Sequence, residues 1–156
     1  MNRNELIESA SMLGPFNQEA VLEYTEKIDR LVVIMNETMA SRPDVNELIG
    51  DNNLSMMKDN HANHARFIAS VMQNFNSEVL VDTILWVFRA YRSRSFHSSY
   101  WAAQLNTWMT IFEKEFTRET YGEVRRLYRW MQVNIPSFVI CSDEKLSENK
   151  SMHLTD

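Results

Sequence analysis

Apolar side chains recur every three or four residues along most of this chain, a spacing that is typical of amphipathic α-helices. A short helix is expected over roughly residues 4–13, and Gly14-Pro15 ends it because proline cannot continue a helix. Asn17 can then cap a second helix that extends to about residue 41. Its buried face is expected to hold five apolar residues at this spacing, namely Val21, Tyr24, Ile28, Leu31 and Met35.

A third long helix is predicted after residue 53, and its seam is the most regular in the chain. Before it, the stretch between Pro43 and Gly50 has room for only a turn or two of helix. The seam keeps the three-four spacing throughout, yet it includes two histidines at positions that otherwise hold apolar residues. In order, these positions are Leu54, Met57, His61, His64, Ile68, Val71 and Phe75.

Three more helices follow from the same pattern. Asn76 precedes a helix over roughly residues 78–92, and a serine-rich connection is expected to supply the cap of the next helix. That helix carries a line of large apolar residues, and a last helix begins after Thr117 and is expected to stop at Pro136. The large residues on the line are Trp101, Leu105, Trp108, Phe112 and Phe116.

The fold expected from these elements is all-α. A single-domain bundle of about five to six helices is predicted over residues 4–140, followed by a flexible polar tail over residues 141–156. The composition agrees, because three glycines and three prolines are too few for the turns of a hairpin-rich β fold.

Charge and cysteine content narrow the partners and the compartment. The net charge is −5, and no strongly basic segment of the kind that binds nucleic acid is present. The chain also lacks an apolar run of the roughly 20 residues that span a membrane. A single cysteine, Cys141, cannot form an internal disulfide. A cytoplasmic protein without nucleic-acid or membrane partners is therefore expected.

The two histidines on the seam leave two interpretations open. His61 and His64 lie three residues apart, so both rings face one neighbourhood and could hold a ligand or a metal in a bundle core. The other predicted stripes supply aromatic and aliphatic residues rather than further metal ligands, so no metal site is predicted. The alternative is that both imidazoles are structural and hydrogen-bond to neighbouring polar groups.

The aromatic residues admit a similar pair of interpretations. Trp101 and Trp108 lie on one helical line, where they can form part of the core or wall a ligand pocket. The candidate ligand-binding or cofactor-binding set is therefore His61, His64, Trp101 and Trp108. The identity of any cofactor is left open.

Catalytic signatures are missing from the sequence. It contains no GxSxG, P-loop, GxGxxG, CxxC, HExxH or EF-hand motif, and Cys141 has no obvious base beside it. No catalytic residue is assigned, and a protein that is not an enzyme is expected.

The stretch from Asp82 to Phe116 resembles the helical module that precedes the cobalamin-binding domain in some bacterial sensor and regulatory proteins. The resemblance rests on a Trp, a later Arg, and an aromatic residue and a Leu that open the next helix, here Trp86, Arg94, Tyr100 or Trp101, and Leu105. The chain lacks a βα unit and the Asp-x-His-x-x-Gly loop that ligates cobalt in that family. The resemblance therefore implies a free-standing helical sensor or adaptor that dimerises.

Two functions of different classes are consistent with these features. The first is a non-enzymatic bacterial signalling or regulatory domain that acts through helix–helix contacts, as a homo-oligomer or with a protein partner. The second is a carrier or sensor for a small-molecule ligand, haem or metal, with a pocket lined by histidine and aromatic side chains.

Overall fold

The computed structural model describes the backbone of residues 1–154 and the side chains of residues 1–144. This part of the chain contains no strand, which confirms the all-α prediction. It contains seven helices rather than the five to six expected, because the short stretch after Pro43 forms a complete helix of its own. The helices are α1 (Arg3–Ala10), α2 (Gln18–Ala40), α3 (Val45–Ile49), α4 (Leu54–Gln73), α5 (Ser77–Arg92), α6 (Ser99–Glu115) and α7 (Arg118–Leu154).

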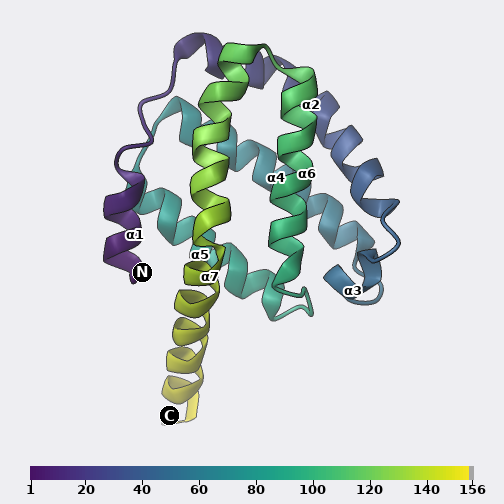
Figure 1. Ribbon diagram of the computed structural model, residues 1–156. Helices are drawn as coiled ribbons and strands as arrows, with labels where there is room; N and C mark the ends of the chain where they lie inside the picture. The colour runs from purple at the N-terminus through teal and green to yellow at the C-terminus, as the bar shows by residue number, and fades with distance from the viewer. Residues whose placement is uncertain (155–156) are drawn as a thin grey trace.

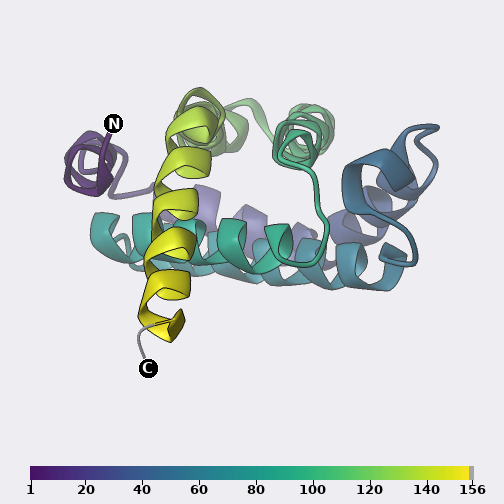
Figure 2. The same ribbon diagram turned by 90° about the horizontal axis from the view of Figure 1, so that it is seen from below.

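The helices are arranged in two layers that cross each other. In Figure 1, α1, α6 and α7 lie roughly parallel or antiparallel to one another across the front, while α2, α4 and α5 pass behind them. Figure 2 shows α1, α6 and the first part of α7 nearly end-on above the second layer, and the C-terminal part of α7 runs down across that layer. Helix α7 contacts α2, α5 and α6, so it joins both layers. None of the helices in the described part of the chain combines the length and apolar character needed to cross a membrane.

Side-chain caps mark the starts of several helices, although not always as predicted. Asn17 accepts a hydrogen bond from the backbone nitrogen of Glu19 at the start of α2, and Asn76 does the same at the start of α5. At α6 the N-cap residue, Ser98, makes no such bond. His97 Nδ1 instead accepts from the backbone nitrogen of Ser99. The expected serine cap is therefore replaced by an imidazole.

An aromatic column on α6 forms the centre of the core. Trp108 stacks on Phe112 with a centroid separation of 5.3 Å, and Phe112 stacks on Phe116 at 5.0 Å. Neighbouring helices meet this column edge-on, with Tyr24 of α2 at 6.1 Å and Tyr128 of α7 at 5.2 Å from Phe112. The line of large apolar residues predicted from the sequence therefore connects three helices.

A half-buried ionic cluster holds the start of α7 against α2. The Glu23 carboxylate accepts hydrogen bonds from the backbone nitrogen and hydroxyl of Thr117 at 3.0 and 2.8 Å. Lys27 donates to the same carboxylate and to the backbone carbonyl of Glu115. Burial acts to raise the pKa of Glu23, but the hydrogen bonds from Lys27, Thr120 and Thr117 outweigh it, and the pKa falls to about 2.

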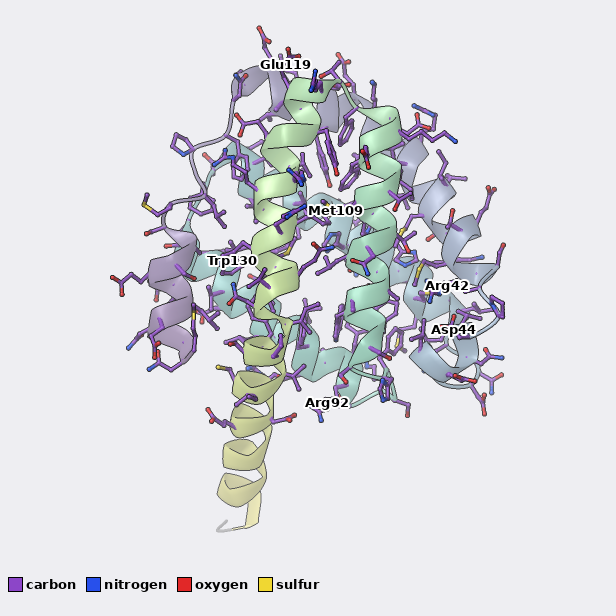
Figure 3. All side chains as sticks on the ribbon, viewed as in Figure 1. Arg42, Asp44, Arg92, Met109, Glu119 and Trp130 are labelled. Atoms are coloured by element: carbon purple, nitrogen blue, oxygen red, sulfur yellow. The ribbon has the colours of Figure 1, made fainter. Side chains whose placement is uncertain are left out.

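Contacts at the edges of the fold fix the shorter segments. The Trp130 side chain of α7 lies against α1 (Figure 3), and its Nε1 donates to the Ser9 hydroxyl at 2.9 Å.

In the connection between α2 and α3, Arg42 and Asp44 form an ion pair with two hydrogen bonds (Figure 3). Gly14 lies against the ring of Phe75, where an added Cβ would come within 2.4 Å of a ring carbon. A residue with a Cβ would therefore clash with Phe75 at this position in the connection between α1 and α2.

Helix α7 does not stop at Pro136, so that prediction is wrong. An internal proline removes one backbone hydrogen bond and costs about 3 kcal/mol. Contacts beyond it offset this cost, because Phe138 is buried between Phe88 and Trp130, with both centroid separations at 5.5 Å. The first described residues after Ile140 also contact the bundle, since Ser142 is buried and Asp143 pairs with Arg92.

The proposed division at residue 140 stays a prediction. Backbone helix continues through residue 154, whereas side chains from 145 onward and residues 155–156 lie outside the described part. The flexibility expected for residues 141–156 and the domain limits 4–140 stay predictions.

The Trp108 indole is fully buried at the end of the aromatic column nearer the N-terminus of α6, so its removal should leave a large cavity. We expect Trp108→Ala to lower the free energy of unfolding by about 3–5 kcal/mol in urea denaturation. Trp86→Ala is the matched control, because Trp86 is 61% exposed and its loss should change stability by no more than about 0.5 kcal/mol. Similar losses in both variants would contradict the central role of Trp108.

Candidate ligand-binding cavity

A cavity of about 400 Å³ lies between α4, α5, α6 and α7. Residues from each of these helices line it, and most of them are apolar or aromatic. The lining comprises Asn60, Asn63, His64 and Phe67 from α4; Thr83, Ile84, Trp86, Val87, Phe88, Ala90 and Tyr91 from α5; Arg94; Trp101, Gln104 and Leu105 from α6; and Met131 and Phe138 from α7.

The exposed members of this lining locate the mouth of the cavity. Asn63, Trp86 and Arg94 are exposed to solvent, and they come from α4, α5 and the end of α5. Deeper in, the Phe88 and Trp101 rings stack on each other at a centroid separation of 4.5 Å and form an aromatic part of the wall. The cavity therefore opens beside α5, and its lining residues on α6 and α7 include the buried side chains of Leu105 and Phe138.

Two buried amides form the polar part of the interior. Asn60 and Gln104 are 3% and 1% exposed, respectively, and both line the cavity. Asn60 Oδ1 accepts hydrogen bonds from the Tyr100 hydroxyl at 2.7 Å and from Gln104 Nε2 at 3.1 Å. Two helices thus present a rigid amide pair to one space, because neither side chain can rotate without breaking these bonds.

His64 reaches the cavity as a neutral ring. Its Nε2 forms a hydrogen bond with the Tyr128 hydroxyl at 2.5 Å, and its ring stacks against Trp108 at a centroid separation of 5.8 Å. Burial, and secondarily the neighbouring His61, lower the pKa of His64 to about 3. The imidazole is therefore uncharged at neutral pH.

His61 lies outside the cavity lining, enclosed in the core. Its Nδ1 is 2.7 Å from Asn36 Oδ1, and an amide oxygen can only accept, so Nδ1 carries the proton and Nε2 has the lone pair. In the described residues, His61 Nε2 and Trp108 Nε1 are the fully enclosed side-chain nitrogens without a hydrogen-bond partner. Burial lowers the pKa of His61 to about 4.

The structure divides the four residues that the sequence singled out. His64 and Trp101 line the cavity, whereas His61 and Trp108 form the packed layer behind it. His61, His64 and Trp108 are nevertheless close together, since both imidazoles contact the same indole. Their role in binding a ligand or cofactor stays a prediction. Within the described part of the chain, no group of three or more His, Cys, Asp or Glu residues is arranged to hold a metal ion.

Sequence reasoning missed the amide pair. Gln104 lies four residues from both Tyr100 and Trp108, so it interrupts an aromatic helix face at a position where an apolar residue is expected. Asn60 directly precedes His61, one position off the predicted seam. A polar residue on an aromatic stripe was the available signal, but only the tertiary contact between α4 and α6 brings the two amides together.

Comparison with protein-family models, curated proteins and solved structures finds no match to this chain. The resemblance to the helical module of bacterial cobalamin-type sensors therefore stays a prediction.

The buried imidazole of His61 should make stability depend on pH. The folded protein keeps His61 neutral down to about pH 4, whereas the unfolded chain binds a proton near pH 6.5. This contribution is full above pH 6.5 and is lost as the pH falls toward 4. Between pH 7.5 and 5, His61 should lower the free energy of unfolding by about 2 kcal/mol.

Urea denaturation of the wild type and His61→Gln at both pH values measures this contribution. The variant should lose about 2 kcal/mol less than the wild type over the same pH interval. An equal pH dependence in the two proteins would show that His61 is not held neutral in the fold.

Proposed function

We propose that this chain is a non-enzymatic, small-molecule-binding helical domain of the sensor or carrier class, with its ligand in the cavity between α4, α5, α6 and α7. The observation that carries the proposal is the cavity itself, with a volume of about 400 Å³. Protein interiors are otherwise packed as densely as organic crystals, and ligand sites have volumes of about 300–1,000 Å³. A space of this size with a mainly apolar lining is characteristic of a binding site.

The lining supports a flat or partly aromatic organic ligand. The mutually stacked rings of Phe88 and Trp101 form an aromatic part of the wall, and flat apolar ligands pack well against aromatic rings. Trp86 at the mouth can cover the ligand after entry, since its indole is exposed and belongs to the lining. Asn60 and Gln104 supply polar groups that can orient the ligand.

An organic ligand is favoured over haem or a metal ion. A haem iron would be bound through an imidazole nitrogen that is free and faces the ligand. Nε2 of His64 is already engaged by Tyr128, and Nε2 of His61 is enclosed away from the cavity lining. Iron ligation at either position would require the core to rearrange.

The proposal also includes signalling, in which α7 would transmit the effect of ligand binding to a partner. Met131 and Phe138 of α7 line the cavity, and the helix continues to Leu154, projecting past the other helices in Figure 1. A ligand that displaces these side chains would therefore move a helix that extends beyond the bundle. The expected homodimer, the cytoplasmic location and the lack of a nucleic-acid partner stay predictions.

The neutral fluorescent probe N-phenyl-1-naphthylamine tests the cavity as a binding site. We expect saturable binding by the wild type, with one probe per chain. Val87→Phe should weaken this binding by about tenfold or more, because Val87 lines the cavity and the larger side chain occupies space that the probe needs.

Val79→Phe is the matched control on the same helix. Val79 is 56% exposed and is not part of the lining, so this variant should bind the probe as the wild type does. Thermal melts of all three proteins check that they are folded. Binding that is absent from the wild type, or equal in both variants, would overturn the proposed site.

A further inference from the structure

The buried amides of Asn60 and Gln104 indicate which hydrogen-bonding groups the ligand carries, which the apolar walls do not. Each of the two side chains uses one of its polar ends within the fold. Asn60 uses its oxygen to accept from Tyr100 and Gln104, and Gln104 uses its nitrogen to donate to Asn60. The nitrogen of Asn60 and the oxygen of Gln104 have no hydrogen-bond partner among the described residues.

The orientation of both amides follows from the Tyr100 hydroxyl. Burial raises the pKa of Tyr100 well above its ordinary value, so the hydroxyl keeps its proton and needs an acceptor. Asn60 Oδ1 is the acceptor at 2.7 Å, and this assignment places the Asn60 nitrogen on the other side. Gln104 must then direct its nitrogen toward the same oxygen, because two amide oxygens would repel each other.

The free ends of the amides open into the cavity. Asn60 and Gln104 are almost fully buried and both line the cavity. Their free atoms are nevertheless not among the fully enclosed side-chain atoms that lack a partner, which are His61 Nε2 and Trp108 Nε1. The accessible surface that they retain therefore faces the cavity. A buried amide group without a partner is costly, so a ligand that satisfies both ends would gain affinity.

We propose that the ligand is a neutral, flat heterocycle that carries a hydrogen-bond acceptor and a hydrogen-bond donor on adjacent atoms, as a lactam or cyclic imide does. Asn60 Nδ2 donates to the acceptor, and Gln104 Oε1 accepts from the donor. This inference rests on the proposed function, because it names the class of ligand for the same cavity. The Phe88–Trp101 stack would pack against the heterocycle from one side.

The charges around the cavity favour a neutral ligand over a carboxylate. A carboxylate offers two acceptors, and one of them would face the Gln104 oxygen and be repelled. His64 is neutral, and Arg94 is exposed at the mouth, away from the buried amides. No buried cation among the described lining residues would therefore stabilise an anion at this depth.

Displacement of N-phenyl-1-naphthylamine by a set of bicyclic compounds tests this inference. 2-Quinolinone carries the lactam N–H beside its carbonyl, 1-methyl-2-quinolinone lacks the donor, and naphthalene lacks both groups. 4-Methyl-2-quinolinone controls for the added methyl group, since it keeps the N–H. We expect both compounds with a lactam N–H to bind the wild type about tenfold or more tightly than the other two.

Gln104→Met removes the acceptor while keeping a side chain of similar length. We expect its affinity for 2-quinolinone to fall about tenfold or more, with the affinity for naphthalene changed by less than about threefold. Gln132→Met is the matched control, because Gln132 is bonded to Asn106 and is not part of the lining. It should leave all four affinities unchanged.

The outcomes separate this inference from the proposed function. If the wild type binds the fluorescent probe but all four compounds compete equally, the lactam class is wrong and the cavity still binds ligands. If the wild type does not bind the probe, the proposed function itself fails. The compound series in the wild type is informative even if Gln104→Met does not fold.

Discussion

The aromatic column of Trp108, Phe112 and Phe116 on α6 is the interaction on which the rest of the structure depends. Its rings meet side chains from α2, α4 and α7, so three neighbouring helices take their positions from one face of α6. Aromatic side chains bury large areas and prefer a few defined pair geometries. The column therefore buries a large apolar surface, and it also fixes the angle at which the two layers of helices cross.

The cavity lies further along the same helix, where the column ends. Toward its N-terminus α6 presents Trp101, which stacks on Phe88 of α5 rather than on another ring of its own helix. Helices α4 and α7 contact the column through His64 and Tyr128, and both helices also line the cavity. Beyond Pro136, α7 still lines the cavity through Phe138, which packs against Phe88.

The imidazoles and tyrosine hydroxyls in and directly behind the cavity wall are neutral at physiological pH. The imidazoles of His61 and His64 have lowered pKa values, and the Tyr100 and Tyr128 hydroxyls have raised ones, in each case because burial disfavours the charged form. Recognition in such a site depends on the direction of donors and acceptors rather than on charge. An amide pair fixed by a tyrosine hydroxyl is well suited to that task.

The sequence by itself determined the all-α class, the positions of most helices and most of the residues in the core. The three-four spacing located the aromatic line of α6, and asparagine caps located the starts of α2 and α5, because both signals are local and depend only on helix geometry. Tertiary structure decided the rest. It carried α7 through Pro136 by burying Phe138, and it enclosed His61 while leaving His64 at the cavity. It also paired Asn60 with Gln104, residues 44 positions apart whose contact depends on how α4 crosses α6, which no local pattern records.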